Sequence, residues 1–182
     1  MDDYKFAYKQ RLILLIGNIG NGKSTYLRNH KELCEKYVVV SRDCMRYMLG
    51  NGEYVFNTNF EPAVWSAEES LFCGLLATHV NIIVDEVNMN LGMRSRYIGP
   101  AIESGYHVTG IVFPQLSMEE SVKRRLGSNH GYFKYDVWCE VWSRFNMNYT
   151  QPSFHEGFDR IITINPKDGT EKITEKPLGV SY

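Results

Sequence analysis

A glycine-rich run between two segments of different character constrains this chain more than any other feature. Residues 12–16 form a continuous apolar run, and residues 24–36 have the composition of a helix. Between them lies Gly-Asn-Ile-Gly-Asn-Gly-Lys-Ser, residues 17–24. An apolar strand that turns through glycines into a helix gathers backbone N–H groups at a position where they bind phosphate. The run therefore predicts an α/β fold with a phosphate-binding first turn.

The expected nucleotide-binding residues follow from this pattern. Glycines adopt positive φ without strain, which lets successive N–H groups turn toward one anion. We expect Lys23 to neutralise the β- and γ-phosphates of ATP and to act in catalysis, and the Ser24 hydroxyl to bind Mg²⁺. The whole set is Gly17, Asn18, Ile19, Gly20, Asn21, Gly22, Lys23, Ser24 and Thr25.

Apolar runs alternate with helix-like stretches along the rest of the chain. We expect strands at residues 12–16, 37–40, 81–85, 106–113 and 160–164, and helices at 24–36, 61–79, 93–104, 117–126 and 135–147. This alternation is typical of a three-layer α/β fold, here a five-stranded, mainly parallel sheet with helices on both faces. One domain is expected over residues 1–182, with its core at about 11–164. The tail, residues 165–182, is expected on the surface as turns or a hairpin, without an assigned function.

Composition excludes several classes of protein. The net charge is −1, whereas general binders of polyanions are basic, so any contact with nucleic acid must be local. The four cysteines lack the spacing of a zinc site, and a chain of 182 residues needs no disulfide framework. The opening Met-Asp-Asp-Tyr is acidic, and the apolar run 12–16 is too short for a membrane span. We expect a cytoplasmic protein without a membrane partner; the oligomeric state is not indicated.

A second acidic position accompanies the predicted phosphate loop. Asp85 ends the apolar run 82–84, about sixty residues after the loop. In such folds an acidic residue at the tip of a neighbouring strand lies near Mg²⁺, so Asp85 and Ser24 form the expected metal site. The alternative is an aspartate that only begins a turn. Glu86 is expected to point the other way, because side chains alternate along a strand.

The segment after the second expected strand carries a possible base and an anion-binding group. Asp43 lies at the carboxyl end of that strand, where α/β sheets bind ligands, and can accept a proton from an attacking hydroxyl. If a helix begins near Asp43, Arg46 lies on the same helix face. The alternative is that Asp43 only caps the helix and Arg46 makes a solvated ion pair. Local chemistry alone leaves both interpretations open.

Four segments together resemble a known family. Gly-x-x-Gly-x-Gly-Lys-Ser-Thr at 17–25, Arg-Asp-x-x-Arg at 42–46, the segment 85–90 and the Glu-Gly-Phe at 156–158 are similar to the kinase domain of phage polynucleotide 5′-kinases. The markers span about residues 11–164. The resemblance implies a P-loop kinase-like fold with a small lid.

The resemblance also implies roles for individual residues. Asp43 matches the general base, and Arg46 matches the arginine that binds the phosphate next to the acceptor hydroxyl. Asp85 and Asn88 are expected to contact the substrate. Arg124 matches the first lid arginine and is expected to be catalytic; the alternative is that it belongs to a solvated basic helix face. The family's second lid arginine corresponds to Ser128 here, which leaves Arg125 as a candidate to replace it at the ATP phosphates.

The combined expectation is transfer of the ATP γ-phosphate, with Mg²⁺, to a hydroxyl of a nucleic acid, namely the 5′-OH of a DNA or RNA strand. Two alternatives use the same fold: a kinase of a hydroxymethylated base in DNA, and a kinase of a nucleoside, nucleotide or small metabolite. A third is a nucleotide-binding switch without catalysis. The aromatic residues Tyr54, Phe56, Phe60 and Trp65 either stack on a base of the acceptor or pack in the core.

Overall fold

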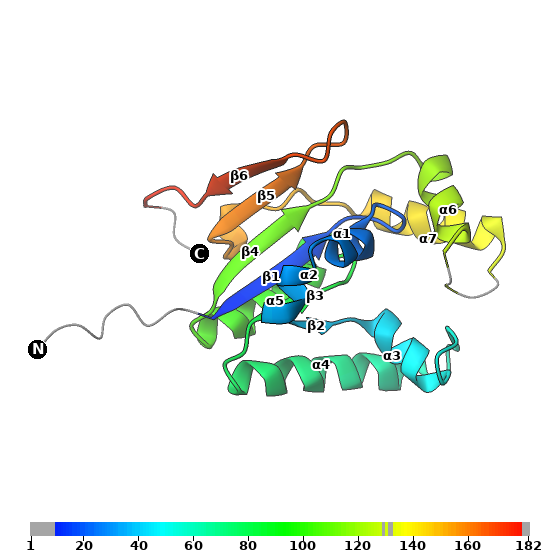
Figure 1. The fold of residues 1–182 in the computed structure, drawn as a ribbon, viewed down its shortest axis with the longest axis horizontal. Coiled ribbons are helices and arrows are strands. Elements are labelled where there is room, and N and C mark those ends of the chain that lie inside the picture. Colours follow the sequence, from blue (N-terminus) through cyan, green and yellow to red (C-terminus); the bar gives the residue numbers. More distant parts are fainter. Residues whose placement is uncertain (1–9, 129, 131–132, 180–182) are drawn as a thin grey trace, which may run out of the picture.

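One mixed sheet of six strands organises the molecule. The computed structural model describes residues 10–128, 130 and 133–179. The strands lie in the order β2-β3-β1-β4-β5-β6 (Figure 1). Neighbours from β2 to β5 are parallel, and β6 is antiparallel to β5. The strands are β1 (Arg11–Ile16), β2 (Val38–Val40), β3 (Ile82–Val84), β4 (His107–Val112), β5 (Arg160–Ile164) and β6 (Glu171–Glu175).

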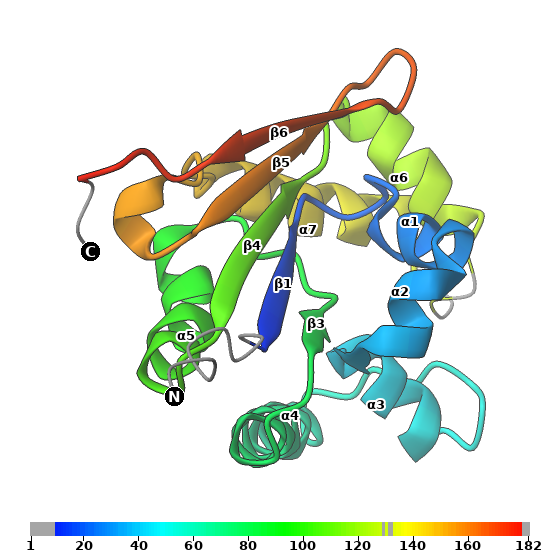
Figure 2. The same ribbon diagram turned by 60° about the vertical axis from the view of Figure 1, so that its left-hand side comes forward.

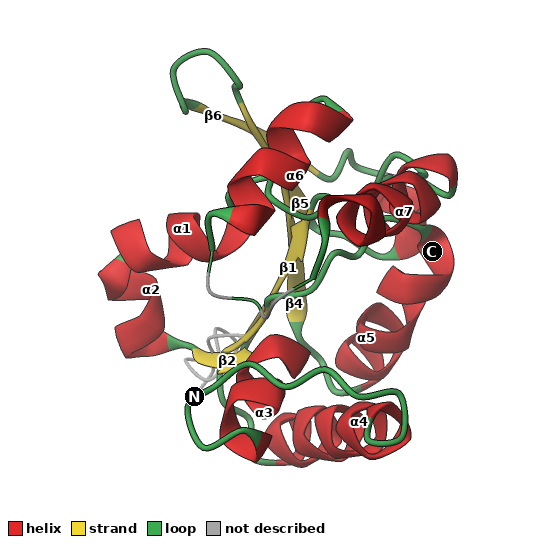
Figure 3. Ribbon diagram, turned by 90° about the vertical axis from the view of Figure 1, so that its right-hand side faces the viewer, coloured by secondary structure: helices red, strands yellow, loops and turns green. Residues whose placement is uncertain are grey.

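Helices cover both faces of the sheet. Figure 2 shows α4 below the sheet and α1 and α2 beside it, and Figure 3 shows α1 and α2 on the opposite side from α4, α5 and α7. The helices are α1 (Lys23–Asn29), α2 (Lys31–Lys36), α3 (Arg42–Leu49), α4 (Glu61–Ala77), α5 (Leu91–Glu103), α6 (Met118–Leu126) and α7 (Tyr135–Met147), with a short 3₁₀ turn η1 (Phe154–Glu156).

The central strand β1 explains why these layers form. Leu12 and Leu14 are fully buried on one face, where they pack with Phe72 of α4 and Tyr97 of α5. Leu15 is fully buried on the other face, in the cluster that contains Leu27 of α1. A strand covered on both faces is a continuous apolar run rather than an alternating one. The expected α/β fold with helices on both faces is therefore confirmed.

The structure differs from the expectation in two elements. The sheet has six strands rather than five, because residues 171–175 of the tail pair with β5. The pairing makes a hairpin, which is one of the two arrangements that the sequence predicts for the tail. The helix expected at 24–36 is divided at His30, whose φ of −109° and ψ of 63° are not helical. A helix does begin at Arg42, so Asp43 and Arg46 share one helix as the pattern required.

The parallel strands bring the candidate residues together. The carboxyl ends of β1, β2 and β3 are followed directly by the glycine-rich loop, by α3 and by Asp85. Parallel strands end at the same edge of a sheet, which is where α/β folds bind ligands. Among the described residues, no helix has the length and apolar character needed to span a membrane.

Candidate active site

The glycine-rich loop has the backbone conformation that phosphate binding requires. Gly20 and Gly22 have φ of 69° and 95°, and Gly22 is the N-cap of α1. The Gly17 N–H donates to the carbonyl of Val87, which fixes the start of the loop. A Cβ at Gly20 would lie 2.3 Å from the carbonyl oxygen of Ser121 in α6. Glycine is therefore needed at position 20 both for its backbone angle and for the close approach of α6.

Two asparagines attach the loop to the segments that carry α6 and α7. Asn18 donates to the carbonyl of Trp142 at 3.0 Å, and Asn21 donates to the carbonyl of Pro114 at 2.7 Å. Both asparagine side chains are buried. Ile19 packs with Trp138 of α7 in a small apolar cluster. These three side chains face protein, so any contact they make with a nucleotide uses their backbone.

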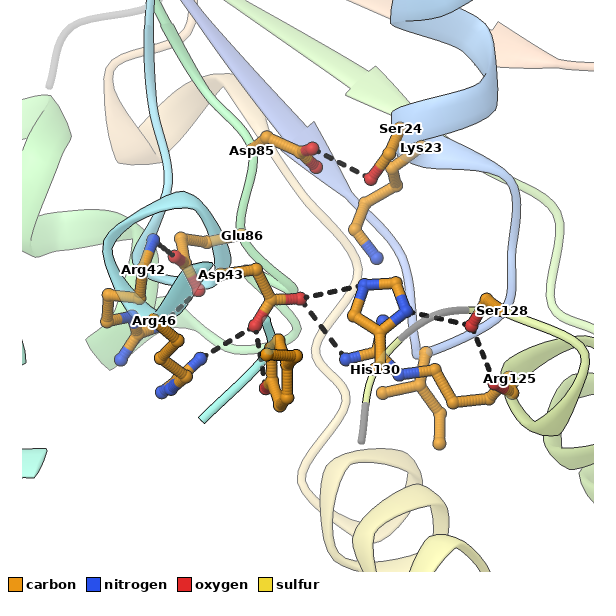
Figure 4. A network of polar contacts seen from close by, with 12 residues as sticks. Lys23, Ser24, Arg42, Asp43, Arg46, Asp85, Glu86, Arg125, Ser128 and His130 are labelled. Carbon is orange, nitrogen blue, oxygen red and sulfur yellow. Dashed lines mark hydrogen bonds and ion pairs between the residues drawn. The ribbon is translucent and has the colours of Figure 1, made fainter. Parts of the chain in front are cut away.

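Lys23, Ser24 and Asp85 form the polar group next to the glycine-rich loop. Lys23 Nζ donates to the carbonyls of Gly17 and Asn18 at 2.8 and 3.0 Å. Burial lowers the pKa of Lys23 to about 8. The Ser24 hydroxyl donates to Asp85 Oδ2 at 2.8 Å (Figure 4). Burial raises the pKa of Asp85, and the charge of Lys23 opposes that rise.

The expected metal site fits Mg²⁺ by its donor chemistry. A hydroxyl and a carboxylate are hard oxygen ligands, and Mg²⁺ binds through one or two such groups together with substrate phosphates. In the described part of the chain, no group of three or more His, Cys, Asp or Glu residues could hold a metal ion. A Mg²⁺ ion held by Ser24 and Asp85 would therefore need the phosphates of a nucleotide.

Asp43 is the most highly connected carboxylate of the site. Arg46 Nη1 and the Tyr54 hydroxyl donate to Oδ1 at 2.7 and 3.0 Å. Arg125 Nη2 and His130 Nε2 lie 3.1 and 3.4 Å from Oδ2. Figure 4 shows Asp43 between Arg46 on one side and His130 and Arg125 on the other. The structure therefore unites residues from α3, the following loop and the end of α6.

The surroundings of Asp43 determine its ionisation. Burial by itself would raise the pKa of Asp43, but a hydrogen bond from His130 and the charges of Arg125 and Arg46 outweigh burial. The pKa of this carboxyl therefore lies well below its ordinary value. Burial raises the pKa of Tyr54, and the charge of Asp43 adds to that effect. Tyr54 thus remains a protonated donor to an ionised Asp43.

Arg46 already has a second carboxylate partner that the sequence did not indicate. Its Nε and Nη2 donate to the two carboxylate oxygens of Glu61 at 2.9 and 2.7 Å, the paired geometry that guanidinium and carboxylate favour. Glu61 begins α4, and no local pattern marks it because the contact joins two helices. Arg42 makes the corresponding contact with Glu86, through its backbone N–H and its guanidinium.

The two arginines at the end of α6 lie in different environments. Arg124 is half exposed and pairs with Glu120 one turn earlier in the same helix. Arg125 is mostly buried, contacts Asp43 and lies over the ring of Trp138, 4.7 Å from its centroid. The Ser128 hydroxyl donates to the carbonyl of Arg125. Arg125, rather than Arg124, is the cation that the structure places beside the candidate base.

Other predicted residues have structural contacts. Asn88 is buried with φ of 48°, and its side chain donates to the carbonyl of Leu15 at 2.9 Å. Thr25 accepts a hydrogen bond from Arg28. In the Glu-Gly-Phe segment at 156–158, Glu156 pairs with the fully buried Arg94, and Phe158 lies in the core. Asn88 and this late segment therefore hold the fold around the site.

The fold and the loop geometry define a P-loop kinase-like protein, and such a fold implies binding of ATP. Residues 12–152 match the model of the AAA domain family AAA_33, and the chain belongs to that family. No curated protein matches the chain.

Three solved structures illustrate the similarity. A chain in the structure of the Pnkp1/Rnl/Hen1 complex is 28% identical over 64% of this chain and 39% of its own length, with a TM-score of 0.52. A chain of the Pnkp1/Rnl/Hen1 RNA repair complex is 22% identical over 81% of this chain and 48% of its own length, with a TM-score of 0.62. A fungal RNA kinase is 15% identical over 95% of this chain and 80% of its own length, with a TM-score of 0.59. The chain thus spans less than half the length of the first two.

Proposed function

We propose that this protein transfers the γ-phosphoryl group of ATP to a hydroxyl of a nucleic acid, namely the 5′-OH of a DNA or RNA strand. The observation that carries the proposal is the position of Asp43. Its carboxylate lies at the carboxyl edge of the sheet, with Arg46 on one side and Arg125 on the other. A base flanked by two guanidinium groups suits a reaction that moves a proton and develops charge on phosphate oxygens.

The proposed reaction assigns each group a step. The loop amides and Lys23 bind the ATP phosphates. Ser24 and Asp85 would hold Mg²⁺, which would neutralise part of the phosphate charge. Asp43 accepts the proton of the acceptor hydroxyl while the oxygen of that hydroxyl forms a bond to the γ-phosphorus. The bond from that phosphorus to the β–γ bridging oxygen breaks, and ADP leaves. Arg125 stabilises the negative charge of the transferring group.

The low pKa of Asp43 gives Arg125 a second function in this proposal. A carboxylate held by Arg125, Arg46 and His130 is ionised but is a weak base. ATP offers Arg125 a phosphate partner. Movement of Arg125 from Asp43 Oδ2 to the γ-phosphate would raise the pKa of Asp43 and free that oxygen for the acceptor hydroxyl. Donor binding would then activate the base.

The choice of a nucleic-acid acceptor rests on the residue pattern at 42–46 and on similarity to chains described as an RNA kinase and as part of an RNA repair complex. One observation favours a second candidate, a small acceptor without a phosphate next to its hydroxyl. Arg46 is bound by both oxygens of Glu61 and by Asp43, so its charge is already balanced. A phosphate-bearing acceptor would have to displace Glu61.

The test is a transfer assay with γ-labelled ATP. The acceptor panel contains 5′-hydroxyl oligonucleotides of DNA and RNA, the same strands with a blocked 5′ end, strands with hydroxymethylated bases, and free nucleosides and sugars. The proposal expects label on 5′-hydroxyl strands and none on blocked ones. Asp43→Asn should lower kcat by about 10²- to 10⁴-fold on every acceptor, and Lys23→Met should abolish transfer. Label only on small molecules, or only on modified bases, would reject the proposed acceptor.

A further inference from the structure

Helices α3 and α4 contact each other through two pairs of side chains one helical turn apart. Arg46 pairs with Glu61, and Arg42 lies over the ring of Trp65 with its Cζ 3.8 Å from the ring centroid. Residues four apart lie on one face of a helix, so these pairs form a row that leads away from Asp43. Arg96 of α5 extends the row, with its Cζ 4.8 Å from the same ring. Figure 3 shows α3, α4 and α5 next to one another.

A pocket opens at the far end of this row. It is lined by Arg42, Trp65, Asn88, Met93, Arg96 and Tyr97. The Nε of Arg42 is buried and lacks a hydrogen-bond partner within the described ranges. Its Nη2 and its backbone N–H are both bound to Glu86. Arg42 is therefore a fixed guanidinium at one wall of the pocket, with its charge balanced by Glu86, and the remaining cation of the pocket is Arg96.

Arg96, at another wall, is held much more loosely. The nearest carboxylate in the described structure is that of Glu69, at 4.0 Å, and the two side chains are 37% and 68% exposed. An ion pair so long and so exposed contributes little to stability, so an incoming anion can replace Glu69 at little cost. Glu68 lies behind Tyr97, whose hydroxyl donates to it at 2.6 Å. Burial raises the pKa of Glu68, which lessens its opposition to an anion bound at Arg96.

We propose that Arg96, oriented by Trp65 and flanked by Arg42, binds a backbone phosphate of the acceptor strand beyond the nucleotide whose hydroxyl faces Asp43. This inference rests on the proposed nucleic-acid acceptor. A phosphate suits the site better than a stacked base, because guanidinium groups already lie over the Trp65 ring. The net charge of −1 also requires that contacts with a strand be few and local. Nucleic acids supply phosphates at regular intervals, whereas a small acceptor would leave Arg96 unused.

The direct test measures binding of a single-stranded 5′-hydroxyl oligonucleotide with a fluorescent label at its 3′ end, without ATP, over a range of salt concentrations. Arg96→Ala should weaken binding about ten-fold and reduce the slope of log affinity against log salt by about 0.7, the value for one phosphate on a single strand. Glu69→Gln should strengthen binding. Arg160→Ala is the matched control, because Arg160 is equally exposed and pairs with Glu175 on the far strands of the sheet.

A transfer assay separates this inference from the proposed function. In wild type, kcat/KM for an oligonucleotide should exceed that for a nucleoside 3′-phosphate, and Arg96→Ala should reduce this ratio while Arg160→Ala preserves it. The inference is overturned if Arg96→Ala and Arg160→Ala bind the strand equally well, or if wild type does not bind it. If binding depends on Arg96 but no nucleic acid is phosphorylated, the subsite stands and the proposed reaction fails.

Discussion

At the scale of single residues, ATP binding requires a positive charge on Lys23, but the burial of this side chain disfavours its charged form. Its pKa of about 8 means that its charge is lost as the pH rises through 8. The protonated fraction in the free protein falls about ten-fold between pH 7 and pH 9. We therefore expect the affinity for ATP to fall about ten-fold over this interval, measured by calorimetry. Lys23→Arg, which stays charged, should show a flat profile. Wild-type affinity that is constant from pH 7 to 9 would contradict this explanation.

Arg124 and Arg125 are neighbours in sequence with different expected effects. Arg125→Ala should lower kcat by about 10²-fold or more, because it removes a charge beside the transferring group. Arg124→Ala should change kcat less than two-fold, because Arg124 is half exposed and pairs with Glu120 of its own helix rather than with Asp43. The measurement is steady-state kinetics on whichever acceptor is phosphorylated. A larger loss from Arg124→Ala would restore the role that the family resemblance implies for Arg124.

Glu61 determines whether Arg46 is available to an acceptor phosphate. In Glu61→Gln, Arg46 keeps its ion pair with Asp43 and a neutral partner at position 61, but loses the negative charge of Glu61. The preference for a nucleoside 3′-phosphate over the plain nucleoside, measured as a ratio of kcat/KM, should rise about ten-fold. Glu53→Gln is the control, because Glu53 is an exposed carboxylate in the loop before α4. An unchanged ratio in Glu61→Gln would mean that Arg46 does not face the acceptor.

At the scale of elements, the phosphate loop and α6 depend on each other through Gly20. Gly20→Ala places a Cβ at φ of 69° and 2.3 Å from the carbonyl oxygen of Ser121. The loop and α6 must then separate, so we expect ATP affinity to fall at least ten-fold. Gly105→Ala is the control, because Gly105 has φ of 80° but nothing within 4 Å of the added Cβ. It should lower the melting temperature by a few degrees, from backbone strain of about 1–2 kcal/mol, and leave ATP affinity unchanged.

The elements also explain what could be predicted from the sequence. The buried strands β1 and β3 appear as apolar runs because both of their faces are covered. Strand β6 has no such signal, since its residues Glu-Lys-Ile-Thr-Glu are all exposed. Asp43 and Lys23 follow strands directly, so local order places them at one edge of the sheet. Glu61 and Arg96 belong to other helices, and only tertiary packing brings them beside α3.

At the scale of the whole molecule, the buried Arg94 connects α5 to the segment before β5. It pairs with Glu156 and donates to the carbonyls of Asn88 and Thr150. Glu156→Gln leaves a buried positive charge without its partner, and we expect a loss of about 3–5 kcal/mol in the free energy of unfolding. Glu175→Gln, which breaks the exposed pair with Arg160, should cost less than about 1 kcal/mol. Urea denaturation measures the loss of unfolding free energy in both variants. Equal losses would mean that burial of the Arg94–Glu156 pair does not increase its contribution to stability.

Strand β6 has a consequence for behaviour in solution. A sheet edge presents unpaired backbone groups that can join another molecule's edge, and natural proteins discourage this with charged or very short edge strands. The edge strand β6 carries Glu171, Lys172 and Glu175, and the opposite edge strand β2 has only three residues. With a net charge of −1, long-range repulsion between molecules is weak. The charges of β6 and the shortness of β2 therefore protect the sheet from edge-to-edge pairing, and replacing the charges of β6 with apolar residues would make the protein prone to precipitate.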